Sequence, residues 1–521
     1  MAALPAGYVV CGMAACMLAC AAVGQGYSLA GFHRTGTDNW SALEMVGSAA
    51  ITAVIGVGLL AWGRPAQGVP MRRTEATITT TFVWALTGLL GALPFVIDTR
   101  MPYPDAIFEA VSGFTTTGAT VVVDIERGLS RPVLLWRSLM QWLGGMGIVV
   151  LFIAIFPNIG ISGKHMFRTE VPGHSAEGLK PKITETSWVL WKLYALFTAV
   201  EVAALMVLFT WFVPKTRELH WAENLFDAVC HAFTTLSTGG FSTKNASIGW
   251  YDSALLDITL SLFMLVAGVN FGLFYGAMIF KSRRDLRGGF LRRTTWLVVD
   301  GLTVFRRSVE FRVYVVLVLA ATILLSIAIV PNHHGSWLEA FRYGLFMVAT
   351  TVTSTGYGTD DYMAYPPTGL GIVLLLMFIG GMSGSTAGGI KVSRVILLAE
   401  STWAQLHRSI RPQVVQVTRL GREIISEDTL HAVSTFFFVY MACLGLGSLV
   451  VCYTDGVSPQ TAFGAMLTSL SNMGPGPYYE GSDNFARYSP TAKILFSFAM
   501  ILGRLEFFTV LALLLPDVWR H

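Results

Sequence analysis

Phe114-Thr-Thr-Thr-Gly118 is the first of four similar stretches in this sequence; the others are Leu236-Ser-Thr-Gly-Gly240, Val352-Thr-Ser-Thr-Gly356 and Leu470-Ser-Asn-Met-Gly474. Each begins with an apolar residue and ends with glycine, and mostly polar residues fill the positions between. The final glycines are spaced by 122, 116 and 118 residues. A period held over four copies indicates an internal repeat.

The similarity extends beyond these five positions. A hydroxyl residue stands six positions before each glycine, and another stands three positions before it. The two sets are Ser112, Thr234, Thr350 and Thr468, and Thr115, Ser237, Thr353 and Ser471. A single Thr/Gly-rich stretch is typical of an ordinary turn, but four copies in register predict one shared structural role.

Composition places the repeat in a membrane. Of the 521 residues, 53% are hydrophobic and only 13% are charged, whereas soluble proteins carry about 25% charged residues. The mean hydropathy is +0.58, and the net charge of +4 is too small to indicate a nucleic-acid partner. These values exclude a water-soluble globule and a disordered chain, and they predict a polytopic membrane protein.

A membrane-spanning helix needs about 20 mostly apolar residues. Ten stretches meet this requirement, near residues 6–30, 43–62, 77–97, 132–156, 186–213, 253–280, 312–330, 368–399, 430–453 and 491–515. Together with the repeat, they predict an all-α protein with ten transmembrane spans. Two N-terminal spans precede four pseudo-fourfold repeats around one ion pore, each made of a span, a short re-entrant helix and a second span (M1–P–M2).

The repeat divides the chain into five units. The two N-terminal spans and a connecting loop occupy residues 1–74, and the four pore repeats occupy residues 75–182, 183–307, 308–426 and 427–521. Four connections between spans are basic, with 19 Lys/Arg against 5 Asp/Glu, and five are acidic, with 9 against 15. The positive-inside rule places the basic set and both termini in the cytoplasm. The strongest basic segment, 281–307, is either a topology signal alone or a docking surface for a cytoplasmic partner or anionic lipid.

The four glycines suggest a cation site. Non-helical backbone is tolerated at membrane depth only when it is buried in protein or faces a water-filled cavity. Glycine lets the backbone turn its carbonyl oxygens inward, and a ring of carbonyls can replace the hydration shell of a cation. We therefore expect a selectivity filter built from Thr116, Thr117, Gly118, Thr238, Gly239, Gly240, Ser354, Thr355, Gly356, Asn472, Met473 and Gly474. Which of Gly239 and Gly240 holds the filter position stays open.

A second glycine-rich stretch interrupts the predicted span 368–399. Five of the twelve residues from Gly380 to Lys391 are glycine, and each costs roughly 1 kcal/mol relative to alanine in a helix. We expect this stretch to be non-helical and to obstruct the path on the inner side of the filter. A patch of glycines for close helix packing is the alternative. The candidate residues are Gly380, Gly381, Ser383, Gly384, Ser385, Thr386, Gly388, Gly389 and Lys391.

Charged residues also lie inside predicted spans. Arg504 and Glu506 stand in the last span, where a charge is costly and usually faces a cavity or a partner. Arg504 either faces the ion path or forms a structural pair with Glu506. For Glu201, Asp257, Asn270 and Arg137 we expect structural pairing between helices, although Asn270 could also mark another helix break near the pore.

An intramembrane serine enzyme is the main alternative from another class. Gly381-Met-Ser-Gly384 matches the Gly-x-Ser-Gly pattern of rhomboid-like proteases, but such chemistry needs a histidine base near the serine. Most of the ten histidines fall in loops, tails or span edges, and we expect His231 on the wrong side of the filter. No Walker or dinucleotide fingerprint occurs in a suitable context, so we expect no ATP hydrolysis by this chain.

The sequence resembles the Trk/Ktr family of potassium uptake proteins, specifically the TrkH type, over nearly its whole length. The motifs that carry the resemblance are Ser112–Thr120, Gln141–Gly147, Phe167–Gly173, Gly239–Thr243, Gly384–Lys391 and Asn472–Gly476. The resemblance implies potassium uptake across the cell inner membrane and no enzymatic activity. Potassium is then the transported ion, with imperfect discrimination against sodium because each copy offers one key glycine and not the longer TVGYG loop.

The resemblance further implies that the 380–391 stretch is an intramembrane gating loop and that Arg504 is an electrostatic barrier beneath the filter. It implies a homodimer in which each protomer has its own pore, embedded in membrane lipid. It also implies a separate cytoplasmic nucleotide-binding regulatory subunit, TrkA-like, that gates the pore. Two alternatives stay open: the potassium-translocating subunit of a primary pump, whose filter and loop sequences match poorly here, and a cation-coupled potassium symporter.

Overall fold

A computed structural model describes residues 2–32, 38–66, 71–147, 183–282, 303–411, 419–421, 423–474, 484–505 and 507–516. These residues form helices, the loops between them and one β-hairpin whose two strands have two residues each. The first half contains α1 (Ala3–Leu29), α2 (Asp38–Gly63), η1 (Arg64–Ala66), α3 (Arg73–Gly91), α4 (Leu93–Asp98), α5 (Tyr103–Phe114), α6 (Ile125–Gly128), α7 (Arg131–Gly145), α10 (Ile183–Val207), η3 (Leu208–Phe212), α11 (Pro214–Arg217), α12 (Trp221–Leu236), η4 (Ser247–Tyr251), α13 (Ala254–Ala267) and α14 (Phe271–Ser282).

The second half also contains both long and short helices. It contains α16 (Val309–Ile329), η5 (Val330–His333), α17 (Trp337–Val352), η6 (Tyr362–Ala364), α18 (Pro367–Phe378), α19 (Val392–Ile410), β1 (Arg419–Leu420), β2 (Glu423–Ile424), α20 (Glu427–Asp455), α21 (Pro459–Ser471), α22 (Pro490–Arg504), α23 (Phe508–Leu511) and η7 (Ala512–Leu514). The two strands pair antiparallel.

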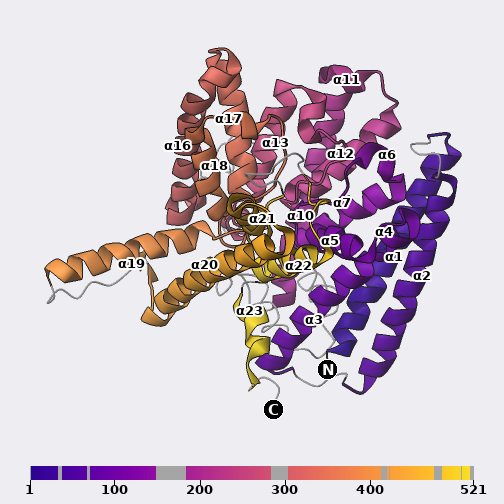
Figure 1. Cartoon of the computed structure of the whole chain (residues 1–521), viewed down its shortest axis with the longest axis horizontal. Helices are drawn as coiled ribbons and strands as arrows, with labels where there is room; N and C mark the ends of the chain where they lie inside the picture. The colour runs from indigo at the N-terminus through magenta and orange to yellow at the C-terminus, as the bar shows by residue number, and fades with distance from the viewer. Residues whose placement is uncertain are drawn as a thin grey trace.

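Helices from distant parts of the chain surround the centre of the molecule (Figure 1). The α1–α2 hairpin flanks α3 and α4 on one side, and α16–α18 lie on the opposite side. The short helices α5 and α21 lie near the centre, while α19 and α20 project outward. The beginning of α1 and the helix α23 lie at the same end of the molecule.

The largest apolar core joins the two ends of the sequence. It contains buried side chains from α1, α3, α5 and α7 together with side chains from α20, α21 and α22. Phe114 and Met140 share this core with Leu470 and Met500. The helices that carry the first and fourth repeated stretches therefore pack beside each other.

The count of ten spans is only partly matched by helix length. Six described helices are long and apolar enough to cross a membrane, namely those within 3–29, 40–63, 74–98, 187–212, 309–333 and 427–455. The pair α13 and α14 would make a seventh, bent by 85° at the break between them. The predicted spans 132–156, 368–399 and 491–515 instead contain the shorter helices α7, α18 and α22, because breaks near Gly145, Gly380 and Arg504 end each helix early.

A buried ion pair joins α5 to α7, and its arginine also bonds to the loop that follows α12. Arg137 Nε donates to Glu109 Oε1 at 2.6 Å, and both side chains are almost fully buried. Arg137 Nη1 also donates to the Ser242 carbonyl at 3.1 Å. Glu109 in turn accepts from the Thr120 hydroxyl and the Val121 amide, each at 3.0 Å. The expectation of structural pairing for Arg137 is thus met.

Glu109→Gln is expected to lower the free energy of unfolding by about 3 kcal/mol, because it leaves the Arg137 charge buried without its counter-charge. Thermal unfolding in detergent measures the change. Glu44→Gln is the matched control, since its partner Arg100 is 77% exposed, and an exposed pair contributes about 0–1 kcal/mol. Equal effects of the two substitutions would contradict a stabilising role for the buried pair.

Candidate ion pathway

The four repeated stretches form the same backbone turn at the ends of α5, α12, α17 and α21. In each copy the residue two positions before the glycine has a left-handed conformation: φ is 55° at Thr116, Thr238 and Ser354, and 52° at Asn472. The amide of the next residue donates to a carbonyl in the preceding helix. These bonds run from Thr117 to Ser112 (2.9 Å), Gly239 to Thr234 (2.8 Å), Thr355 to Thr350 (2.8 Å) and Met473 to Thr468 (3.1 Å).

This turn is a Schellman-type helix cap. It places the hydroxyl residues found six positions before each glycine at the carbonyl that closes the turn. The cap ends each helix abruptly and points its C-terminal end at the glycine loop. A helix C-terminus carries a partial negative charge, so four such ends favour a cation.

The backbone conformation distinguishes the two glycines of the second copy. Gly118, Gly240 and Gly356 have φ of 79°, 77° and 85°, whereas Gly239 is not in the left-handed region. Gly240 therefore corresponds to the other two. Gly474 also lacks a positive φ, so the fourth copy departs from the shared conformation at this position.

The loops approach one another so closely that a Cβ atom would not fit. A Cβ on Gly118 would overlap the carbonyl of Gly239, and one on Gly240 would overlap the carbonyl of Thr355. A Cβ on Gly474 would lie 2.9 Å from the Gly118 carbonyl oxygen. The glycines of copies one, two and four thus contact a neighbouring copy, and the four loops lie together.

Side chains outside the predicted set hold the loops in place. Gln141 Nε2 donates to the Gly239 carbonyl at 2.7 Å, and its Oε1 accepts from the Phe241 amide at 3.1 Å. The Tyr357 hydroxyl lies 2.5 Å from the Thr234 hydroxyl and donates to the His231 carbonyl at 3.1 Å. Sequence reasoning gave these residues no role, although Gln141 lies in a quoted motif and Tyr357 directly follows Gly356.

Pairs of hydroxyl groups lie within the first and third loops. Thr115 and Thr117 hydroxyls lie 2.8 Å apart, and those of Thr353 and Thr355 lie 2.7 Å apart. Asn472 Nδ2 donates to the Thr117 hydroxyl at 3.0 Å. The side chain of Asn472 therefore links the fourth copy to the first.

The outer loops are also joined between copies one and two. Asn245 Nδ2 donates to Asp124 Oδ1 at 2.9 Å, and the Ile125 amide donates to Asn245 Oδ1 at 2.6 Å. The hydrogen bond from Asn245 and that from the Arg127 amide hold the pKa of the Asp124 carboxyl below its ordinary value. Asp124 is thus ionised near neutral pH.

The stretch from Ile379 to Lys391 is not helical, as its glycine content predicts. A parallel bridge between Ile379 and Ile390 closes it into a loop. Gly388 donates its amide to the Ser354 hydroxyl at 2.6 Å, and the Thr386 hydroxyl donates to the Leu236 carbonyl at 3.0 Å. The loop therefore lies directly against the second and third glycine turns.

The remaining predicted loop residues lie either at the bridge between Ile379 and Ile390 or near the break between α13 and α14. Gly380 and Gly389 lie at the bridge, where a Cβ on Gly380 would overlap the Gly388 carbonyl. Gly381 lies near the Gly268 carbonyl and Gly384 near the Asn270 side chain. The Ser385 hydroxyl donates to the Met382 carbonyl at 2.6 Å, and Lys391 Nζ donates to the Ala387 carbonyl.

Arg504 joins three parts of the molecule at the end of α22. Its Nη1 donates to the Thr116 hydroxyl at 3.1 Å and to the Thr386 carbonyl at 2.9 Å. Its Nη2 donates to the carbonyls of Gly144 and Gly145 at 2.6 and 2.8 Å. The guanidinium thus contacts the first glycine turn, the Gly-rich loop and the end of α7. Glu506 lies outside the described residues.

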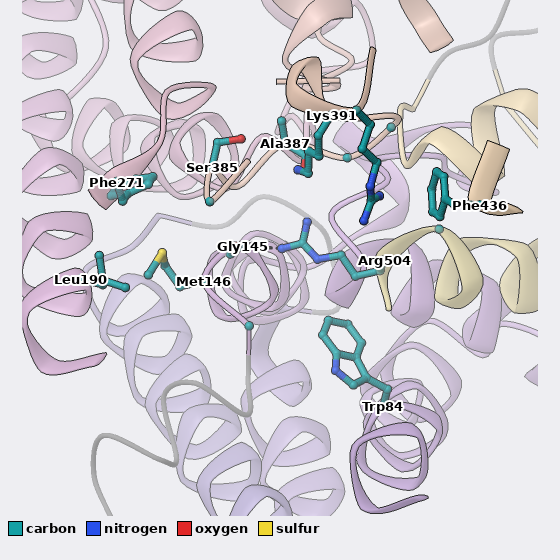
Figure 2. A pocket seen from close by; sticks show the side chains of 16 residues that line it. Trp84, Gly145, Met146, Leu190, Phe271, Ser385, Ala387, Lys391, Phe436 and Arg504 are labelled. Atoms are coloured by element: carbon teal, nitrogen blue, oxygen red, sulfur yellow. Dashed lines mark hydrogen bonds between the residues drawn. The ribbon is translucent and has the colours of Figure 1, made fainter. Parts of the chain in front are cut away.

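A cavity of about 80 Å³ borders Arg504 and the Gly-rich loop. Figure 2 shows Arg504 and Lys391 on one side of it, with Ser385 and Ala387 on the loop and Met146 and Leu190 farther along. The cavity is large enough for a few water molecules. Basic groups at its wall oppose the entry of a cation.

The other polar residues named in the sequence analysis lie away from the cavity or support the Gly-rich loop. Arg342 Nε donates to Asp257 Oδ2 at 2.7 Å, the expected structural pair. Asn270 Oδ1 accepts from the Gly272 amide at 2.7 Å at the α13–α14 break, and the Phe271 amide donates to the Gly384 carbonyl at 3.1 Å. Glu201 is fully buried in α10, and its carboxylate oxygens have no hydrogen-bond partner among the described residues, so the expected pairing is not found there. His231 lies behind the second turn, with Nε2 3.0 Å from the Ser242 hydroxyl.

Comparison with known proteins matches almost the whole chain. A family model described as "TrkH: Cation transport protein" covers residues 44–517. The Trk system potassium uptake proteins TrkH of Salmonella typhimurium and Escherichia coli are each 33% identical over 467 residues, covering 89% of both chains. TrkG of Escherichia coli is 31% identical over 461 residues, covering 87% of this chain and 87% of TrkG.

The structure agrees with the sequence relationship. The crystal structure of the potassium transporter TrkH from Vibrio parahaemolyticus superposes with a TM-score of 0.82 at 28% identity, covering 100% of this chain and 99% of that one. The family consists of transport proteins and not enzymes, so the serine-enzyme alternative is set aside. With several helices apolar enough to cross a membrane, the chain is a multi-pass membrane protein that belongs to the TrkH family of cation transport proteins.

Proposed function

We propose that this chain carries potassium ions across the membrane along a path lined by the four glycine turns. The observation that carries the proposal is the shared helix cap, which brings four helix C-termini to closely packed loops. Relatives with at least 31% identity are named potassium uptake proteins, and potassium is taken here as the cargo, not as a cofactor.

The proposed architecture has ten spans, with two N-terminal spans before four M1–P–M2 repeats arranged with pseudo-fourfold symmetry. The units are 1–74, 75–182, 183–307, 308–426 and 427–521. The shorter helices α7, α18 and α22 take the place of the second span in their repeats. The 85° bend between α13 and α14 supports the same pattern in the second repeat.

Backbone carbonyls are the proposed ligands of the ion. The Thr115–Thr117 and Thr353–Thr355 hydroxyl pairs are engaged with each other, so they hold the turn and leave carbonyl oxygens to face the ion. The fourth copy lacks the left-handed glycine conformation, which makes the ring unequal. An unequal ring with one key glycine in each copy supports good but imperfect discrimination between potassium and sodium.

The Gly-rich loop and Arg504 form the proposed gate. The loop contacts two filter turns, and Arg504 bonds both the loop and Thr116. A fixed guanidinium repels a dehydrated cation that leaves the filter, because the low dielectric of the interior strengthens their repulsion. Opening would require the loop and Arg504 to separate.

The wider setting is proposed from the family resemblance. The protein would be a homodimer in the cell inner membrane with both termini cytoplasmic, and each protomer would have its own pore. A separate nucleotide-binding subunit, TrkA-like, would dock on the cytoplasmic side and control the loop. The basic stretch 281–307 is the proposed contact region for it.

Uptake of radioactive rubidium into liposomes containing the purified protein tests the function. Potassium-selective conduction predicts uptake that follows an imposed voltage and is reduced more by unlabelled potassium than by sodium. Voltage-independent uptake driven by a proton or sodium gradient would point to a symporter. No protein-dependent uptake under either condition, with or without the cytoplasmic subunit, would contradict the proposal.

Gly240→Ala is expected to reduce rubidium uptake at least tenfold or to abolish its preference over sodium. The residue has φ of 77°, and a Cβ would overlap the Thr355 carbonyl. Gly358→Ala is the control, because nothing lies within 4 Å of its Cβ position. Normal selective uptake by both variants would show that the second loop is not part of the filter.

Arg504→Ala is expected to raise rubidium flux several-fold, because it removes both the positive charge and the bonds that hold the Gly-rich loop. Arg504→Lys keeps the charge but not the four bonds, so it separates the two effects. Arg411→Ala, at an exposed position after α19, is the control. Unchanged flux of Arg504→Ala at equal protein amount would show that Arg504 is no barrier.

A further inference from the structure

One carboxylate oxygen holds both limbs of the Gly-rich loop. Glu310 lies in the first turn of α16, and its Oε1 accepts the Ser383 amide at 2.7 Å and the Ser393 amide at 3.2 Å. Ser383 belongs to the outgoing limb of the loop, and Ser393 to the first turn of α19, where the loop ends. Glu310 itself is not in the loop, so it acts as an external clamp.

Groups around this contact partly offset the cost of burying the carboxylate charge. The N-terminus of α19 carries a partial positive charge that attracts an anion, and Lys391 adds a favourable charge interaction with Glu310. Hydrogen bonds to a charged acceptor are roughly twice as strong as neutral ones. The clamp therefore depends on charge as well as on shape.

The two limbs are joined a second time beside Glu310. The hydroxyls of Ser383 and Ser393 lie 2.5 Å apart. At its opposite end the loop bonds to the filter turns through Thr386 and Gly388. The loop is thus held at one end by α16 and at the other by the filter.

Residues 303–307, the described end of the basic segment, lead into the first turn of α16, which carries Glu310. Arg306 and Arg307 are exposed, and Ser308 caps the helix by accepting the Phe311 amide at 3.2 Å. Glu310 follows only three residues after Arg307. A partner that displaces this segment would move the start of α16 and with it the carboxylate.

We infer that Glu310 is a positioning residue that latches the Gly-rich loop in its obstructing position and releases it when the segment before α16 moves. The inference rests on the proposed function, because a latch on this loop matters for transport only if the loop blocks the ion path. It adds a specific link between the cytoplasmic surface and the gate.

Two measurements on the full-length protein test the latch, with Glu310→Ala, Glu310→Gln and the control Glu400→Gln, an exposed site on α19. The first is amide hydrogen exchange in peptides that contain Ser383 and Ser393. The second is rubidium flux in liposomes without added partner. Glu310→Ala should speed exchange in both peptides about tenfold, the effect of losing one charge-assisted hydrogen bond. Flux should rise with its potassium-to-sodium preference unchanged.

Glu310→Gln should fall between Glu310→Ala and the native protein, because its amide oxygen still accepts but carries no charge. A merely structural role would lower thermal stability without raising flux, and that result would overturn the latch. If Glu310→Ala does not fold, the Gln variant carries the test. If Glu310→Ala has the same amide hydrogen exchange and rubidium flux as the native protein while Arg504→Ala has raised flux, the latch is refuted but the proposed gate is not. Loss of rubidium uptake in every form, the native protein included, would instead refute the proposed function.

Discussion

The close approach of four backbone turns is the constraint on which the rest of the structure depends. The glycines of three copies lie where any Cβ would press against a carbonyl of the next copy. Such contact is possible only if each turn has a fixed shape. The helix caps supply that shape, and the Gln141 and Tyr357 side chains fix it from outside.

The turns keep their shape at a cost. A non-glycine residue in the left-handed conformation costs roughly 1–2 kcal/mol, and every copy has one, at Thr116, Thr238, Ser354 or Asn472. Hydrogen bonds from buried groups and dense packing around the turns offset this cost. Glycine at these positions would relieve the strain but would leave the chain free to adopt other conformations, so a rigid site favours the bulkier residues.

The sequence allowed the membrane class, the fourfold period and the non-helical Gly-rich loop to be predicted, because hydropathy, spacing and glycine content are local signals. It did not reveal the left-handed threonines, since β-branched residues disfavour that conformation and only tertiary packing enforces it. It also did not reveal the helix ends at Gly145 and Arg504, which shortened two predicted spans. The roles of Gln141, Tyr357 and Glu310 depend on contacts between residues about 70 to 125 positions apart, which one sequence does not show.

The most direct test of the account is to locate a potassium substitute in the protein by anomalous diffraction from crystals grown in thallium or rubidium. The account predicts a peak enclosed by backbone carbonyls of all four turns, close to Gly118, Gly240, Gly356 and Gly474. No peak there, together with ordered ions elsewhere along the chain, would contradict it.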